Sequence, residues 1–500
     1  MKAKLHIPTD LKELNLTKAM EHMTDKKREK MQQVLHLTYS TPSNKTKRIS
    51  KSKISDEHVQ EMVFSDLCEP TDQDSKVTCK VFLIPEPEKN RSRIITWPVL
   101  LNEVITEPYK TMGSFTLADI TDTFKLVADS KYGGVVDLKC SFFQIGLTPE
   151  QRNIFVFQTS LGKFRMKKVP MGLTTAAEMM QLITEQLTND CKKVHVTVHI
   201  DNILIAGSKE HVEIAMKQIV DTAASQDISI GECYTGTEVQ AFGFSFDFGK
   251  GEVRISQKKL LKLKALQSID WINTTVRDFL SFFGKAHYYA RAMWSHHNSK
   301  VCLAHHFNSM QLLRQIARKM TEVPTKLHLY SQLYLTTTDV SCMMKMLDAV
   351  ICSHPVPISS IKRPVITITS DASTVGSGWI IQNDRGTILL QSSRKYTKDG
   401  RHINEKELHA LGEALKSYAN LSINTKVQIH WKSDNMTAIT VLEKKSSASR
   451  TLNDVCSFVL QMAWIYDFPI TNAVWIPTAS NEADGLSRLG YVTDTWKAQT

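Results

Sequence analysis

The pattern of hydrophobic and polar residues predicts a chain of mixed α and β structure. Two apolar runs, CKVFLIP from Cys79 and RIITW from Arg93, flank a polar turn and predict a strand hairpin with a basic tip. GVVDL, at Gly134–Leu138, is typical of a short buried strand that ends in an acid. VHVTVHIDNILI, at Val194–Ile205, predicts a second hairpin with an acid at its tip. Helical spacing over residues 172–187 predicts a helix between these strands.

The second half of the chain changes character twice. Residues 257–320 lack strand signals and carry helical periodicity. A Pro-containing stretch, His354–Pro364, then precedes an α/β unit that opens with the strand VITIT at Val365 and runs nearly to the C-terminus. Because 500 residues exceed what one hydrophobic core usually holds, we expect about two to four domains.

The first 75 residues are polar and basic, with a KKREK run at Lys26–Lys30. Such a segment suits an arm that follows nucleic acid or a localisation signal. A solvated, partly disordered extension is the default expectation.

Composition and charge restrict the class of protein. The chain is 42% hydrophobic with a formal net charge of +11, which suits a polyanionic partner but also fits a basic soluble protein without one. Nine cysteines are scattered without a CxxC pair, as expected of reduced thiols in a cytoplasmic or nuclear protein that is not secreted. The N-terminus is not an apolar leader and no run of about 18 apolar residues occurs, so we expect no membrane segment.

Two acids at predicted strand ends, Asp137 and Asp201, form a candidate catalytic pair. Nucleotidyl transfer uses two divalent ions about 3.5–4 Å apart, and carboxylates from adjacent strands can hold both. Strand tips often carry Asp, so the pair alone is weak evidence. The surrounding residues carry more weight.

Five motifs accompany this pair in a characteristic order: VDLKCSFFQIGL at 136–147, KKVPMGLTTAAEMMQ at 167–181, HIDNILIAG at 199–207, FGFSFDFGKGEVRIS at 242–256 and VRDFLSFFGKAHYYAR at 276–291. In this order they resemble the first metal motif, the Pro-x-Gly-Leu motif, the second metal motif, the primer-grip hairpin and the thumb signature of retroelement reverse transcriptases. The resemblance includes LTR-type elements and the tyrosine-recombinase elements of the DIRS or VIPER kind.

This resemblance implies roles at matching positions. Asp137 and Asp201 would bind the catalytic metal ions, with the backbone carbonyl of Leu138 assisting. Phe142 would be the steric gate that excludes a 2′-hydroxyl, although its alternative is an ordinary core aromatic. The remaining predicted nucleotide-binding residues are Arg93 of the fingers, Gly172, where the backbone would approach the nucleotide, and Asn202.

Asn202 and His199 depart from the family pattern, which usually reads Tyr-x-Asp-Asp. An asparagine keeps an oxygen ligand but removes one negative charge, so weaker metal binding is expected. If the second acid is essential in this family, the polymerase is crippled. If it is supportive, activity survives at a reduced rate.

Four further acids follow the Pro-containing stretch: Asp371 near the end of VITITSDAS, Glu407 on an amphipathic helix, Asp434 at the end of VQIHWKSD and Asp484 in NEADGLSR. Two-metal hydrolysis of a phosphodiester requires such a cluster. Each acid alone would more often be a surface charge, and Asp484 could simply cap a helix. Their order and flanking residues resemble RNase H, except that the histidine often found upstream of the last motif is missing from AVWIPTASNEAD.

The predicted fold is an α+β right-hand polymerase of fingers, palm and thumb, followed by a three-layer α/β RNase H-like domain. The predicted divisions are 1–75 as a basic extension, 76–250 as fingers and palm, 251–330 as a helical thumb, 331–363 as a connection and 364–492 as the RNase H domain.

The predicted function is RNA-directed DNA synthesis with RNase H activity. The expected partners are an RNA template, a DNA primer, an RNA–DNA hybrid and deoxynucleoside triphosphates, with two Mg²⁺ or Mn²⁺ ions in each active site. Asn202 keeps two alternatives open: a degenerate copy that binds nucleic acid without catalysis, and an RNase H with an impaired polymerase.

Overall fold

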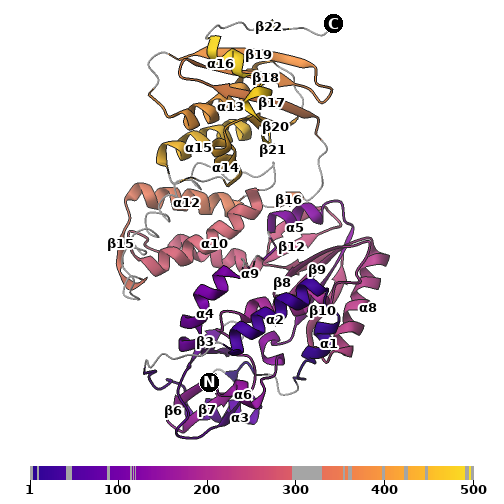
Figure 1. Ribbon diagram of the computed structural model, residues 1–500, viewed down its shortest axis with the longest axis vertical. Helices are drawn as coiled ribbons and strands as arrows, with labels where there is room; N and C mark the ends of the chain where they lie inside the picture. The colour runs from indigo at the N-terminus through magenta and orange to yellow at the C-terminus, as the bar shows by residue number, and fades with distance from the viewer. Residues whose placement is uncertain are drawn as a thin grey trace. The chain divides into compact units, whose positions relative to one another are not determined.

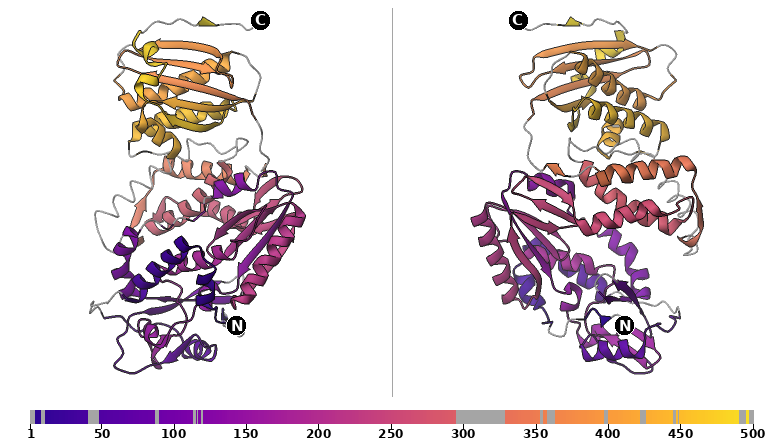
Figure 2. Two further views of the ribbon diagram at one scale, coloured as in Figure 1. Left: turned by 45° about the vertical axis from the view of Figure 1, so that its right-hand side comes forward. Right: turned by 180° about the vertical axis from the view of Figure 1, so that it is seen from behind.

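The computed structural model divides into two compact units, Met1–Glu252 and Val253–Thr500 (Figures 1 and 2). It describes residues 4–7, 11–40, 48–86, 90–112, 115, 117–118, 120–294, 329–352, 355–357, 363–396, 400–421, 426–444, 447, 449–489 and 495–496. Among the helices in these ranges, none combines the length and apolar character that a bilayer crossing requires.

The first unit is built from short strands and helices in mixed order. In chain order these are β1 (Lys4–Leu5), α1 (Leu16–Glu21), α2 (Asp25–Ser40), α3 (Asp56–Phe64), β2 (Cys68–Pro70), β3 (Lys80–Glu86), β4 (Arg91–Trp97), α4 (Val99–Thr111), α5 (Ile120–Leu126), β5 (Tyr132–Leu138), η2 (Ser141–Gln144), α6 (Pro149–Arg152), β6 (Val156–Thr159), β7 (Gly162–Met166), α7 (Ala176–Gln186), β8 (His195–His199), β9 (Asn202–Gly207), α8 (Lys209–Ser225), β10 (Ile230–Gly236), β11 (Glu238–Ala241) and β12 (Phe244–Asp247), with β13 (Glu252–Ile255) at the boundary.

A four-stranded antiparallel sheet in the order β10-β5-β9-β8 carries the two candidate polymerase acids. The apolar residues Val136, Ile203 and Ile205 of the central strands are buried in the main core of the unit. Helix α8 packs against β5 and β9 of this sheet. Both predicted hairpins, β3–β4 and β8–β9, and the helix α7 are confirmed.

The N-terminal segment is an integral part of this unit. Met31 and Val34 of α2 are fully buried in its core, and the amide of Leu14 donates to the carbonyl of Gln144 at 2.9 Å. The KKREK run lies on α2, where Lys27 pairs with Glu185 at 2.9 Å and Lys30 approaches Glu178 at 3.6 Å. The expectation of a solvated, partly disordered extension is therefore wrong for the described part of this segment, because its apolar residues complete the core.

The second unit opens with helices and ends with an α/β domain. After β13 it contains α9 (Gln257–Ala265), η3 (Leu266–Ser268), β14 (Asn273–Thr275), α10 (Val276–Trp294), β15 (Gln332–Tyr334), α12 (Thr337–Cys352), β16 (Val356–Pro357), β17 (Val365–Ala372), β18 (Gly376–Gln382), β19 (Ile388–Lys395), α13 (Ile403–Asn420), β20 (Gln428–Ser433), α14 (Met436–Lys444), α15 (Arg450–Ile465), β21 (Ile470–Trp475), η5 (Thr478–Ser480), α16 (Asp484–Leu489) and β22 (Thr495–Trp496).

The predicted helical character of residues 257–320 is confirmed by α9 and α10 as far as residue 294, and residues 295–320 lie outside the described part. The segment predicted as a connection contains the 16-residue helix α12, which packs against α10. The finer division into thumb and connection stays a prediction.

The C-terminal domain is a six-stranded sheet in the order β21-β20-β17-β18-β19-β22. Strands β17, β18 and β19 are antiparallel, whereas β20 runs parallel to both β17 and β21. Helix α13 covers one face, and α15 packs over α13 (Figures 1 and 2).

Helix α16 lies against the other face, where two glycines of β18 admit it. Side chains alternate along a strand, so Gly376 and Gly378 face away from Trp379, which packs in the core with Leu408 of α13. A Cβ added at Gly378 would lie 2.5 Å from the Cβ of Leu486 and 2.8 Å from the amide nitrogen of Ser487. The GSG sequence thus brings Asp484, the first residue of α16, close to the sheet.

We expect Gly378→Ala to destabilise this domain by on the order of 1–3 kcal/mol, because the new methyl group must push α16 away from β18. Urea unfolding measures the change. Gly400→Ala is the matched control, since a Cβ there meets nothing within 4 Å. Equal losses in the two variants would contradict the assigned packing.

Candidate active sites

The first candidate site lies where β5 and the β8–β9 hairpin end together. Asp137 is the penultimate residue of β5 and stands opposite Asn202 of β9 in the antiparallel register. Asp201 occupies the two-residue tip between β8 and β9, and its carbonyl accepts a 2.9 Å hydrogen bond from the amide of Leu138. The structure therefore brings the two predicted acids to neighbouring strand ends.

The tip of the β8–β9 hairpin has a strained backbone and is hydrogen-bonded to helix α7. Ile200 has φ of 59°, a left-handed conformation that a β-branched residue rarely adopts. The buried side chain of Gln181 on α7 accepts from the amide of Ile200 and donates to the carbonyl of Val198. One glutamine thus bridges the strand and the turn that carry Asp201. Sequence reasoning missed this role, although Gln181 ends the Pro-x-Gly-Leu motif.

The other predicted nucleotide-binding residues differ in the contacts that they make. Phe142 lies on η2 and packs partly buried against the core. Arg93 donates to Glu86 at 2.7 Å across the β3–β4 hairpin. Gly172 has φ of 109°, and a Cβ there would lie 3.2 Å from the carbonyl oxygen of Thr96. The close backbone approach at Gly172 in this structure is therefore to β4 of the β3–β4 hairpin.

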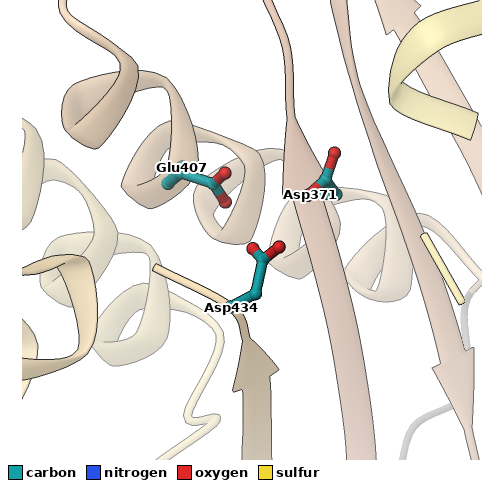
Figure 3. A group of neighbouring side chains, drawn as sticks. All are labelled: Asp371, Glu407 and Asp434. Atoms are coloured by element: carbon teal, nitrogen blue, oxygen red, sulfur yellow. The ribbon is translucent and has the colours of Figure 1, made fainter. Parts of the chain in front are cut away.

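The second candidate site gathers three acids from three separate elements (Figure 3). Asp371 comes from β17, Glu407 from α13 and Asp434 from the end of β20, and one oxygen of each lies within 4.8 Å of the others. Residues far apart in the sequence meet because α13 packs on β17 and β20 runs beside β17.

Burial makes this cluster electrostatically costly. Asp371 and Glu407 expose only 4% and 3% of their surface. Burial, followed by the charge of Asp371, raises the pKa of Glu407 from 4.5 to about 9. Burial, together with the charges of Asp434 and Asp484, raises the pKa of Asp371 to about 6. Fixed donors offset part of the cost, because the amide of Ala372 donates to Glu407 at 3.2 Å.

Asp484 lies in the same cavity but outside the cluster of three. The cavity, of about 450 Å³, is lined by all four acids and by Arg488. Both carboxylate oxygens of Asp484 accept hydrogen bonds from Arg488, the shortest at 2.7 Å. Asp484 is thus paired with Arg488, whereas the other three predicted acids lie next to one another.

Two neighbours that sequence reasoning missed hold the acids in place. The buried amide of Asn481 donates to Asp371 at 3.1 Å, and the indole of Trp475 donates to the carbonyl of Asp434 at 2.9 Å. The position of Asn481, three residues before Asp484 in NEAD, was the available signal. No histidine is among the described residues that line the cavity, and Thr478 of η5 lies there instead.

The donor set of the second site fits a divalent cation. Three close carboxylates repel one another unless they are protonated or neutralised. Among the described residues that line the cavity, Arg488 is the one cation, and it is engaged with Asp484. Oxygen ligands of this kind are preferred by Mg²⁺ and Mn²⁺. The cluster can therefore hold a metal ion.

Comparison with known families agrees with both sites. Residues 93–232 match the family described as "Reverse transcriptase (RNA-dependent DNA polymerase)", and residues 366–488 match the family described as "Reverse transcriptase-like". Each candidate site lies inside one match. The chain therefore carries a reverse transcriptase region followed by a reverse transcriptase-like region.

Curated relatives of this chain are distant and much longer. The retrovirus-related Pol polyprotein from transposon 412 of Drosophila melanogaster is 24% identical over 152 residues, 30% of this chain. The genome polyprotein of Petunia vein clearing virus is 24% identical over 256 residues, 47% of this chain. The chain spans 12% and 11% of the length of these two relatives, respectively.

A solved structure shares the overall fold. The structure described as "foamy viral protease-reverse transcriptase dRH in complex with ds DNA" matches with a TM-score of 0.50 and 12% identity. The match covers 94% of this chain and 84% of that chain. The predicted polymerase followed by an RNase H-like domain is therefore confirmed as a fold.

We expect the metal-free protein to lose stability as the pH rises from about 4.5 to 9. In this window the folded chain keeps a proton on Glu407 that the unfolded chain has released, so the free energy of unfolding falls with pH. Glu407→Gln removes this contribution and should unfold at a higher temperature than wild type at pH 8 in EDTA.

Thermal unfolding with and without Mg²⁺ checks this prediction. Magnesium should stabilise the wild type and have a smaller effect on Glu407→Gln. Glu405→Gln on the same helix is the control. The assignment fails if Glu407→Gln has the pH dependence and the magnesium response of the wild type.

Proposed function

We propose that this chain copies an RNA template into DNA and hydrolyses the RNA strand of the resulting hybrid. The observation that carries the proposal is the presence, on one chain, of gathered acids in both matched regions: two at neighbouring strand ends in the first, and a cluster of three from two strands and a helix in the second. An RNA template, a DNA primer, a hybrid and deoxynucleoside triphosphates are the proposed partners. The proposed domains are fingers and palm to residue 250, thumb to 330, connection to 363 and RNase H from 364.

In the polymerase, Asp137 and Asp201 would hold two Mg²⁺ or Mn²⁺ ions. When bound, these ions lower the pKa of the primer 3′-hydroxyl and neutralise the triphosphate. The protein orients the acids through the β5–β9 register and the Leu138 amide. Arg93 would reach the triphosphate by leaving Glu86, because a guanidinium pairs with phosphate as readily as with carboxylate.

In the nuclease, Asp371, Glu407 and Asp434 would hold the metal ions, with Asp484 at the edge of the site. Cation binding would ionise Glu407, because a nearby positive charge offsets the burial that keeps it protonated. Asn481 holds Asp371 in place, and Arg488 neutralises Asp484 until a cation or a phosphate competes for one of them.

The described cysteines support the expected reducing compartment. Cys68, Cys79 and Cys456 are buried, and burial raises the pKa of the Cys68 and Cys79 thiols to about 12. Such thiols are unreactive core groups. A cytoplasmic or nuclear location is the one we propose.

The two activities should separate by mutation. Asp137→Ala should abolish primer extension on an RNA template and leave hybrid cleavage intact, whereas Asp371→Asn should do the reverse, because each acid belongs to a different site. Extension and cleavage are measured on the same labelled hybrid, and EDTA should abolish both. Extension by Asp137→Ala at the wild-type rate would contradict the polymerase assignment.

Phe142→Val should relax the selection of deoxynucleotides. Removing the ring would make room for a 2′-hydroxyl, so the ratio of kcat/KM for dATP over ATP should fall by roughly 10- to 100-fold. Phe143→Val is the control, because Phe143 is the next residue of η2 and is buried in the core. An unchanged ratio in Phe142→Val would show that Phe142 is only a packing residue.

A further inference from the structure

The carboxylate of Asp201 accepts a hydrogen bond on each of its oxygens. The hydroxyl of Ser141 donates to Oδ2 at 2.8 Å, and the amide of Asn202 donates to Oδ1 at 2.9 Å. Ser141 is 2% exposed and belongs to η2, the turn that follows β5, so its hydroxyl reaches Asp201 from a separate element. The two donors are neutral and donate to different oxygens of the carboxylate.

These two hydrogen bonds restrict the rotation of the Asp201 side chain. The Leu138 amide and the Gln181 side chain already hold the main chain at the tip of the β8–β9 hairpin. Rotation of the Asp201 side chain is the remaining motion, and a hydrogen bond to each oxygen opposes it. A carboxylate has about four lone-pair positions, so two donors leave others for a cation.

Asn202 is suited to this task by its chemistry. An ionised carboxylate only accepts hydrogen bonds, so the Asn202 amide must turn its NH₂ group toward Asp201. An ionised aspartate at this position has no N–H to donate, so it could not make this hydrogen bond to Asp201. The register also places Asp137 between Asn202 and Glu232, so a carboxylate at 202 would add a charge to a row that already contains acids.

We propose that Ser141 and Asn202 are positioning residues that fix the Asp201 carboxylate for metal binding, an inference that rests on the proposed polymerase function. Asn202 is then part of a working site and is not a damaged second metal ligand. Ser141 and Phe142 are neighbours in η2. The hydrogen bond from Ser141 therefore connects the Asp201 carboxylate to the element that contains the predicted steric gate.

The test compares Ser141→Ala and Asn202→Asp in a Glu407→Gln background, where the nuclease cluster is impaired. Ser130→Ala is the matched control, because Ser130 is a buried serine of the same unit outside the site. Manganese binding is followed by electron paramagnetic resonance, with Asp137→Ala in the same background defining binding outside the polymerase site. Primer extension is measured over a magnesium titration.

Ser141→Ala should weaken manganese binding and raise the half-saturating magnesium concentration by roughly 10-fold, as expected for loss of a residue that orients a metal ligand. The KM for deoxynucleotide at saturating magnesium should stay unchanged, since a general loss of structure would raise it too. Asn202→Asp should not extend primers faster than wild type. Ser130→Ala should match wild type in both assays.

Two outcomes would overturn the inference and leave the proposed function standing: a Ser141→Ala variant with wild-type metal dependence, or a gain of extension in Asn202→Asp. Absence of both extension and Asp137-dependent manganese binding in the parent chain would instead overturn the proposed function and this inference with it.

Discussion

The C-terminal site depends on burying like charges next to one another, Asp371 on strand β17 and Glu407 on helix α13. Asp371 and Glu407 are nearly inaccessible to solvent. Leu408, which follows Glu407 in the sequence, is part of the apolar core of the C-terminal domain. Burial at this point opposes ionisation, and the favourable packing of α13 on β17 must offset that cost. A cation would relieve the same cost, so folding prepares the cluster for a metal ion.

The first unit meets the same constraint with fewer charges. Its two candidate acids, Asp137 and Asp201, lie at adjacent strand ends. Asp201 accepts hydrogen bonds from neutral donors: Ser141 and Asn202 donate to its carboxylate, and the Leu138 amide donates to its carbonyl. The strained φ of Ile200 is the local cost of placing Asp201 at a two-residue tip. Gln181 beneath that tip shows that the surrounding structure supports the strain.

Strand patterns and acid positions were predictable from the sequence, whereas the supporting contacts were not. Asp137, Asp201, Asp371 and Glu407 follow or interrupt clear apolar runs, so their elements could be assigned by periodicity. Ser141 donates to Asp201, which is 60 positions away in the sequence, and no local sequence pattern predicts such a contact. The N-terminal segment was misjudged for a related reason: its overall polarity concealed the few apolar positions, such as Met31 and Val34, that α2 buries.

The central claim is that acids from distant segments form two separate sites for divalent cations. Anomalous scattering from crystals of the full chain grown with Mn²⁺ tests it most directly. The account predicts anomalous peaks in contact with the carboxylates of Asp137 and Asp201, and others in contact with Asp371, Glu407 and Asp434. Well-ordered carboxylates with no manganese at either place, in crystals saturated with the ion, would contradict it.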